Sequence, residues 1–381
     1  MITPHTGGRL AGRASGEGTR RFTERFAGRA ATDHFRDAGG WRLSSLGIGT
    51  YLGEPTPADD TAYTDSVEAA VRAGCNIIDT AVNYRAQRSE RSVGTALRRL
   101  FSEGGDYRRE EILVATKGGF LPFDGVYPRD PAEWVRTALI EPGILDEEEI
   151  VAGCHAMTPR YLASQIDWSR RNLGLDCLDI YYLHNPETQL QEVELPSFLD
   201  RLRDAFELLE EKAASGIIGV YGIATWDGLR VPPESPGHLP LQALVKIARG
   251  IGGERHHFRA VQLPVNLVMS EACLAATQAW DGKVIPLLTA AEAAGMVVMS
   301  SGSLLQGRII NALTADFARL MPQTRTNAQR GLQVVRSAPG LAAALVGMRR
   351  AAHVEENLEL ARIPRLMPQR ALEIMSACRR S

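Results

Sequence analysis

The stretch "CLDIYYLHNPETQLQEVELPSFLDRLRDAFELLEEKAASGIIGVYGIA", residues 177–224, contains the structural unit that repeats along this chain. It begins with an apolar run, continues into a segment whose apolar residues have helical spacing, and ends in a second apolar run. Strands that read as continuous apolar runs are typical of parallel sheets, because both of their faces are buried. The stretch therefore predicts a strand at 177–184, a helix at 198–216 and a strand at 217–224.

The same alternation runs through the chain from residue 40 onward. Further strands are expected at 41–51, 75–79, 111–117, 258–266, 296–300 and 341–347, and further helices at 65–74, 89–101, 158–174, 286–295, 327–337 and 351–361. Eight strands interleaved with helices predict an α/β fold of the (β/α)8 TIM barrel type. The alternative is an open doubly wound sheet. That fold usually has a Gly-rich turn of the form GxGxxG after its first strand, and "GIGTYLG" does not match it.

Two regions depart from the repeating unit. Residues 1–35 are expected to form a flexible N-terminal extension, because the first 30 residues hold six arginines with little apolar periodicity, and residues 36–381 are expected to form the barrel. A long loop is predicted after the third strand, at 118–157. Its aromatic residues favour a lid over the barrel mouth, and the alternative is a peripheral insertion. These aromatic residues are Phe120, Phe123, Tyr127 and Trp134. A second long connection is expected at 226–257.

Composition limits the classes of partner. The net charge is -2 and the isoelectric point is near 6.5, which argues against a nucleic-acid or membrane-surface protein and favours a small-molecule substrate. The five cysteines show no CxxC spacing, and the chain has neither a membrane-length apolar run nor a signal-peptide core, so a cytoplasmic protein is expected. No metal site is predicted. The pairs Cys154–His155 and His256–His257 each lack the two further ligands that zinc requires.

Three polar residues end consecutive predicted strands: Asp79, Lys117 and His184. Tyr84 follows in the loop after Asp79. The C-terminal strand ends of such a barrel meet at one mouth, so these four side chains are expected to converge. A lysine charge beside a phenol favours the phenolate and is expected to lower the pKa of Tyr84 from about 10. Tyr84 is then a candidate general acid and base, and His184 a candidate to orient a carbonyl group. The alternative is a buried ion pair beside a core histidine.

Six motifs in this order resemble the aldo/keto reductase superfamily between about residues 40 and 362. They are "IIDTAVNY", "SERSVGTAL", "VATKG", "LDIYYLH", "VQLPVN" and "LVGMRRAAHVEENL". The resemblance implies a barrel, a nicotinamide cofactor bound without a Rossmann fold, and hydride transfer to a carbonyl group. It also implies the catalytic roles: Tyr84 as proton donor, Lys117 and Asp79 as the pair that adjusts its pKa, and His184 as the residue that orients the carbonyl.

The resemblance further implies where the cofactor binds. Thr225 and Gln262 stand where the nicotinamide carboxamide is usually held, and Arg349 and Arg350 are candidates to bind a 2′-phosphate, which favours NADPH with NADH as the alternative. The complete set of expected cofactor residues is Gly49, Thr50, Thr225, Gln262, Leu304, Gly347, Arg349, Arg350, His353, Glu356 and Asn357. Glu356 and Asn357 are expected at the adenine.

Several features depart from the family pattern, among them His353 in place of a common Arg and Ala224 and Thr225 in place of a Ser-Asn pair. Ser301 stands where an aromatic ring commonly stacks on the nicotinamide, and Met348 replaces a Ser or Thr donor. The loop after Tyr84 carries Arg85, Arg88 and Arg91 where the family often has glycines. Arg85 is either a site for a carboxylate or phosphate of the substrate, or a rim charge paired locally, for example with Glu90.

The resulting expectation is an NADPH-dependent reductase of aldehydes or ketones. A nicotinamide-binding regulatory subunit that acts through partners and has little turnover is the alternative. The sequence leaves the substrate, the physiological direction and the oligomeric state open.

Overall fold

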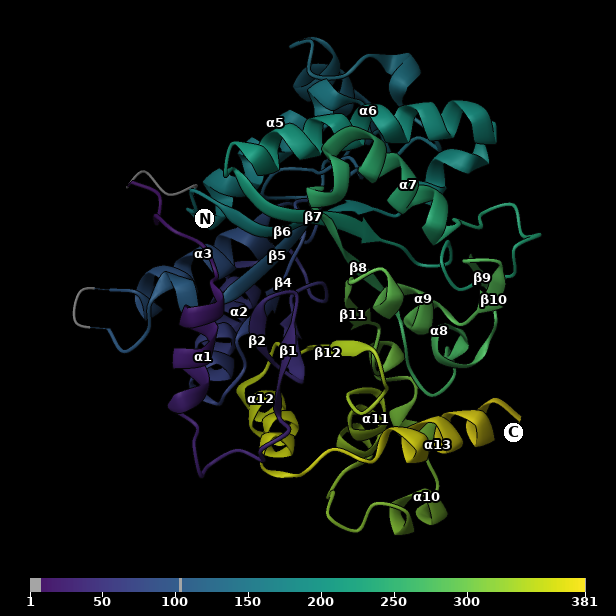
Figure 1. Ribbon diagram of the computed structural model, residues 1–381. Coiled ribbons are helices and arrows are strands. Elements are labelled where there is room, and N and C mark those ends of the chain that lie inside the picture. Colours follow the sequence, from purple (N-terminus) through teal and green to yellow (C-terminus); the bar gives the residue numbers. More distant parts are fainter. Residues whose placement is uncertain (1–7, 103–104, 381) are drawn as a thin grey trace.

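The computed structural model describes residues 8–102 and 105–380, and in these ranges eight parallel strands close into a barrel surrounded by helices (Figure 1). The barrel strands are β3 (Leu46–Gly49), β4 (Ile77–Asp79), β5 (Leu113–Gly118), β6 (Leu178–His184), β7 (Ile218–Ala224), β8 (Phe258–Pro264), β11 (Val297–Ser301) and β12 (Leu341–Gly347). Strand β12 pairs with β3 and closes the ring. The predicted TIM barrel is therefore confirmed, and the open doubly wound sheet is excluded.

A helix follows each barrel strand and covers the outside of the barrel. In chain order these helices are α2 (Pro57–Arg72), α3 (Arg88–Leu100), α5 (Pro159–Leu173), α6 (Leu195–Ala214), α7 (Leu241–Gly252), α9 (Leu287–Ala293), α11 (Asn327–Val335) and α12 (Ala351–Leu358). The outer elements are α1 (Gly16–Glu24), α4 (Pro131–Val135), α8 (Glu271–Leu274), α10 (Ala315–Arg319), α13 (Pro368–Arg380) and the hairpins β1 (Phe35–Ala38)–β2 (Trp41–Ser44) and β9 (Gln278–Trp280)–β10 (Lys283–Ile285). None of the described helices is long and apolar enough to cross a membrane.

The core has two layers because each strand buries both faces. Side chains that point into the barrel form one cluster, which includes Leu43, Ile77, Leu113, Tyr182 and Met299. A larger cluster fills the space between the strands and the surrounding helices. In a continuous apolar run such as 177–184, successive side chains point alternately into the barrel and toward the helices. Both positions are buried, so these strands do not alternate apolar and polar residues.

Two of the helices around the barrel differ most from the sequence prediction. Helix α2 begins at Pro57, eight residues before the expected start, because Thr56 caps it by accepting a hydrogen bond from the backbone N–H of Asp59. The first turn of α2 is polar and showed no apolar period. Helix α7 lies inside the connection 226–257, which was predicted to be a loop. Its buried residues have helical spacing that the Pro- and Gly-rich surroundings obscured: Leu241, Leu244, Val245 and Ala248.

The strand expected at 41–51 is divided into two strands. Strand β2 pairs antiparallel with β1, and β3 enters the barrel after Ser45. This division changes the interpretation of the N-terminal segment, because the β1–β2 hairpin is the surface on which α1 packs.

The prediction of a flexible N-terminal extension is wrong for residues 8–35, and residues 1–7 lie outside the described residues. Phe22 of α1 is fully buried, with its ring 6.1 Å from that of Phe35 and 5.9 Å from that of Tyr107. Arg21 and Arg25 both bind Glu111 at 2.9 Å. The segment is polar overall. Its buried aromatic residues and the ion pairs of its arginines with Glu111 fix it against the rest of the protein.

The long loop after the third barrel strand is present, and it runs from β5 to α5. It folds back on itself, with Phe120 bridged to His155. Phe123 packs against Trp134 at 5.3 Å and against Tyr127 at 6.2 Å, and Trp134 joins a small apolar cluster beside α5. Of the four aromatic residues predicted to form a lid, Phe120 lines the barrel mouth, and the other three contact one another outside the cavity lining.

Candidate active site

The carboxyl ends of the barrel strands surround a cavity of about 1050 Å³. Parallel pairing places the ends of neighbouring strands side by side, as shown by the paired positions Gly49–Asp79 and Ala224–Gln262. Asp79, Tyr84, His184 and all eleven expected cofactor residues line this cavity. Residues from distant parts of the sequence thus converge on one mouth, as predicted.

Lys117 and Asp79 form a buried ion pair at the base of the cavity. The Nζ atom of Lys117 lies 2.9 and 2.7 Å from the two carboxylate oxygens of Asp79 and also donates to the carbonyl oxygen of Thr80 at 2.8 Å. Burial works to lower the pKa of Lys117, but Asp79 and Tyr84 outweigh it and leave that pKa raised. Lys117 therefore carries its positive charge at neutral pH.

Tyr84 lies directly beside this charge. The Nζ atom of Lys117 is 4.8 Å from the centre of the Tyr84 ring. The expected fall in the pKa of Tyr84 is wrong in its net direction: burial raises the pKa of Tyr84, and the charge of Lys117 opposes that rise without overcoming it. The phenol is therefore protonated at neutral pH, and Lys117 limits the cost of removing its proton.

His184 completes the group opposite Tyr84. The two rings are 5.8 Å apart. Burial, and then the charge of Lys117, hold the pKa of His184 well below its ordinary value, so the imidazole is neutral. Its Nδ1 atom is buried without a hydrogen-bond partner among the described residues. His155 binds the carbonyl oxygen of His184 at 2.8 Å, and the ring of Phe120 lies between the two imidazoles, 5.0 and 5.2 Å from them.

The two residues expected at a nicotinamide carboxamide already make contacts within the chain. Gln262 lines the cavity and donates its Nε2 to Asp79 at 2.7 Å, and its Oε1, an acceptor, is not used in this contact. Thr225 donates its hydroxyl to Glu187 at 2.6 Å and accepts from the backbone N–H of Gly228 at 2.8 Å. Gln262 therefore retains a group for a ligand, whereas the hydroxyl of Thr225 mainly holds the loop after β7.

The far end of the cavity contains the residues expected around adenosine. Asn357 is buried and lines the cavity, and its Oδ1 has no hydrogen-bond partner among the described residues. Glu356 accepts a hydrogen bond from Thr326 at 2.5 Å. Arg350 and His353 are exposed at the rim. The Nη1 atom of Arg349 binds both carboxylate oxygens of Asp59, at 2.7 and 2.8 Å.

The remaining expected cofactor residues shape the wall of the cavity. Thr50 is buried, and its hydroxyl donates to the carbonyl oxygen of Asp79 at 3.1 Å. Gly49 and Gly347 are paired across β3 and β12 and present backbone to the cavity. Leu304 lies at the other wall. The two glycines leave room for a ligand to approach the backbone, and Leu304 gives the cavity an apolar wall.

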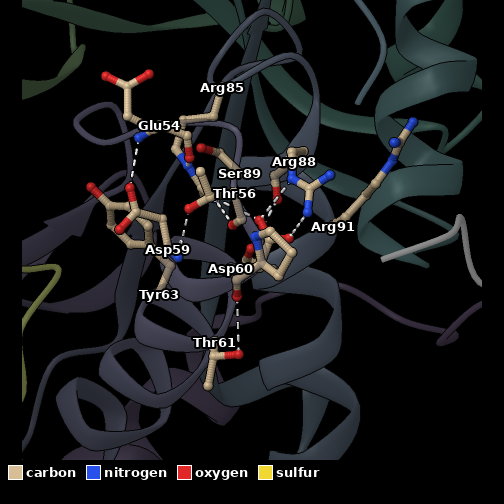
Figure 2. A network of polar contacts seen from close by, with 12 residues as sticks. Glu54, Thr56, Asp59, Asp60, Thr61, Tyr63, Arg85, Arg88, Ser89 and Arg91 are labelled. Atoms are coloured by element: carbon tan, nitrogen blue, oxygen red, sulfur yellow. Dashed lines mark hydrogen bonds and ion pairs between the residues drawn. The ribbon is translucent and has the colours of Figure 1, made fainter. Parts of the chain in front are cut away.

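The arginines after Tyr84 bind acids of the chain itself. Arg85 and Arg88 both form buried ion pairs with Asp60, in the first turn of α2, and Figure 2 shows this network. Arg91 binds Asp124 at 2.5 Å. Arg85 also donates to the carbonyl oxygen of Glu54 at 2.9 Å. The interpretation of Arg85 as a substrate site is therefore wrong. Local pairing is correct, although the partner is Asp60 and not Glu90, since the early start of α2 was missed.

Several cavity residues were not identified from the sequence. Asn83, Asn185 and Trp226 line the cavity, together with the turn 302–308 after β11. Trp226 is 41% exposed, and a Cβ atom at Gly302 would lie 3.7 Å from its ring. An aromatic ring is thus present near Ser301 after all, supplied by a different strand end. Two glycines in "SSGSLLQGR" were the available signal for the turn. The described residues contain no group of three or more His, Cys, Asp or Glu side chains arranged for a metal ion.

Known proteins resemble this chain in sequence over about half of its length. Residues 45–231 match the model of the Aldo/keto reductase family. The chain is 28% identical over 190 residues to the NADH-specific methylglyoxal reductase of Escherichia coli K12, covering 49% of each chain. It is 29% identical over 199 residues to the D-threo-aldose 1-dehydrogenase of a Pseudomonas species, covering 51% of this chain and 54% of the relative. The chain thus spans about half the length of these curated relatives.

The whole barrel resembles solved structures. An aldo-keto reductase from Klebsiella pneumoniae, solved in complex with NADPH, superposes with a TM-score of 0.61 at 21% identity, covering 92% of this chain and 95% of the other. The glycerol dehydrogenase of Gluconobacter oxydans superposes with a TM-score of 0.61 at 16% identity, covering 91% and 95%. These likenesses show the same fold. Together with the matched segment and its relatives, they make the chain similar to the aldo/keto reductase superfamily.

Proposed function

We propose that this chain is an NAD(P)H-dependent oxidoreductase that reduces an aldehyde or a ketone to an alcohol. The observation that supports this most is the Lys117–Asp79 ion pair beside Tyr84, facing His184 at the base of a large cavity. A buried charge next to a phenol has a direct use in proton transfer, whereas an ion pair that served packing alone would need no such neighbour.

The cavity residues fit a dinucleotide. The Oε1 atom of Gln262 is available for a carboxamide, the unpartnered Oδ1 of Asn357 suits the amino group of adenine, and Trp226 offers an aromatic face. Arg349 and Arg350 stand at the adenosine end. When bound, a reduced nicotinamide supplies the hydride. The Klebsiella structure contains NADPH and the Escherichia coli relative is named for NADH, so the proposal includes NADPH first, with NADH as the alternative.

The proton comes from Tyr84. Its raised pKa keeps the hydroxyl protonated at neutral pH, so Oη can donate to the oxygen of a carbonyl group as negative charge develops there. The ammonium group of Lys117 then stabilises the phenolate that remains, and Asp79 holds Lys117 in place. The neutral imidazole of His184 can donate an N–H to the same oxygen and orient it.

Aromatic residues around the mouth limit access of water. Phe120 lies against His184, and the ring of Tyr51 is 5.0 Å from that of Tyr84. We propose that Phe120, at the start of the long loop after β5, is the part of that loop that contacts substrate. Displacing water from this region would strengthen the electrostatic interactions of Lys117 and His184 with the reacting oxygen.

Two measurements on the purified protein test the proposal. Titration of NADPH and NADH, followed by nicotinamide fluorescence, measures binding, and the loss of reduced-nicotinamide absorbance with a panel of aldehydes and ketones measures turnover. Binding with turnover supports the oxidoreductase. Binding without turnover on any carbonyl compound would favour the alternative, a nicotinamide-binding regulatory subunit. Failure to bind either nucleotide would contradict both.

A further inference from the structure

The adenosine end of the cavity contains an ion pair that a cofactor must meet. Arg349 follows β12 and lines the cavity, and its side chain is 35% exposed. Asp59 belongs to the first turn of α2 and is far from Arg349 in the sequence. Both carboxylate oxygens of Asp59 bind the same guanidinium nitrogen, Nη1, at 2.7 and 2.8 Å. The arginine that the sequence assigns to a 2′-phosphate is therefore already neutralised by an acid of the chain.

Asp59 is fixed in this position by its own surroundings. Its Oδ2 accepts a hydrogen bond from the backbone N–H of Glu54 at 2.6 Å (Figure 2). Gly53 adopts a φ of +111°, and a Cβ atom there would lie 2.6 Å from Oδ2 of Asp59 and 3.3 Å from Arg349. Arg85 also binds this turn, because its Nε donates a hydrogen bond to the carbonyl oxygen of Glu54. Only a glycine lets the turn approach this ion pair so closely.

The carboxylate is charged under working conditions. Burial works to raise the pKa of Asp59, but the N–H of Glu54 and the guanidinium of Arg349 outweigh it and lower that pKa. A 2′-phosphate that approaches Arg349 meets a fixed negative charge next to its binding partner. A 2′-hydroxyl carries no charge and can donate a hydrogen bond to a carboxylate. Asp59 thus disfavours binding of NADPH, which carries the 2′-phosphate, and is compatible with binding of NADH.

We infer that Asp59 is a specificity-determining residue, which lowers the preference of the cavity for the 2′-phosphorylated cofactor by occupying Arg349. This inference rests on the proposed function, since it requires a nicotinamide dinucleotide in the cavity. The inference also separates the roles of Arg349 and Arg350. Arg350 is exposed and does not take part in the ion pair with Asp59, so it can bind a phosphate while that ion pair stays intact.

The test is the ratio of dissociation constants for NADH and NADPH, measured by fluorescence titration in the wild type and in Asp59→Asn. Asparagine retains an oxygen for the N–H of Glu54 and removes the charge. The NADH-to-NADPH ratio of Kd is expected to rise about tenfold in favour of NADPH. Calorimetric titration with adenosine 2′,5′-bisphosphate and with adenosine 5′-monophosphate should show the same shift without any catalysis. Asp65→Asn removes an acid from the exposed side of the same helix and should leave the ratio unchanged.

A second substitution tests the mechanism. Arg349→Met in the Asp59→Asn background should return the NADH-to-NADPH ratio of Kd close to the wild-type value, because the effect of Asp59→Asn depends on freeing Arg349. If Asp59→Asn does not fold, Asp59→Ser replaces it with a small side chain suited to a first helical turn. An unchanged ratio in a folded Asp59 variant that binds both cofactors would overturn the inference. Failure of the wild type to bind either cofactor would instead overturn the proposed function.

Discussion

Three side chains of the site have protonation states that depend on burial and on their charged neighbours. Lys117 is held charged by Asp79, Tyr84 is held protonated by burial, and His184 is held neutral by burial and by Lys117. The site thus contains a protonated phenol, a fixed cation and a neutral imidazole close together. This division of protonation states suits the reduction of a carbonyl group.

Lys117→Met is expected to reduce kcat by about a hundredfold or more, because the phenolate formed after proton transfer loses its stabilising charge. The charge of Lys117 lowers the pKa of Tyr84, so removing it raises that pKa further. The alkaline limb of the kcat profile for reduction should therefore move to higher pH in the residual activity. Lys246→Met, on the exposed face of α7, is the control. Full activity of Lys117→Met with an unchanged pH profile of kcat would show that Lys117 has only a structural role.

The sequence predicted which residues converge, but not their electrostatic state. Asp79, Lys117 and His184 end neighbouring strands, and the geometry of a parallel barrel brings strand ends together whatever the side chains are. The pKa of Tyr84 depends instead on how many atoms surround it, which is set by loops from several strand ends. The partner of Arg85 was missed for a similar reason, since Asp60 lies in a helical turn without apolar period.

The connection between β4 and α3 is an element under strain. Arg85, Ala86 and Gln87, directly after Tyr84, all have left-handed backbone conformations, with φ of 50°, 53° and 66°. Such conformations cost free energy in residues other than glycine and persist only when the surroundings hold them. Here Asp60 binds both Arg85 and Arg88 in a buried network. We propose that this network holds the loop that carries Tyr84.

Asp60→Asn is expected to lower the free energy of unfolding by about 3–5 kcal/mol, because it leaves two buried guanidinium groups without their shared carboxylate. Chemical denaturation followed by circular dichroism measures the change. Asp65 lies in the same helix as Asp60 and forms an exposed ion pair with Arg99 of α3, so Asp65→Asn should change stability by less than about 1 kcal/mol. Equal stability of the two variants would show that the network does not hold the loop.

At the scale of the whole molecule, the N-terminal segment belongs to the folded barrel. The segment was expected to be flexible because its arginines dominate its composition. Phe22 lies in α1 and Phe26 in the turn directly after it, and both are buried, but two aromatic residues were too few to show a period. Their burial also required the β1–β2 hairpin, in which β1 was not predicted and β2 was expected to be continuous with β3. Composition alone therefore misjudged a segment that is stabilised by distant residues such as Glu111.

Phe22→Ala is expected to destabilise the protein by about 3–5 kcal/mol, since it removes a fully buried ring packed against Phe26, Phe35 and Tyr107. Thermal unfolding measures the effect. Glu24→Ala, at an exposed position of the same helix, is the control and should have little effect. A wild-type melting temperature for Phe22→Ala would mean that α1 contributes nothing to the stability of the barrel.

The most direct test of the proposed reaction is single-turnover reduction of an aldehyde by the protein preloaded with reduced nicotinamide cofactor, in the wild type and in Tyr84→Phe. Phenylalanine keeps the ring and removes only the transferable proton. The proposal predicts that the wild type oxidises the cofactor in step with loss of the aldehyde. In Tyr84→Phe this rate should fall by about 10²- to 10⁴-fold while the Kd of the cofactor stays within a few-fold. A Tyr84→Phe variant that reduced aldehydes at the wild-type rate would contradict the central claim.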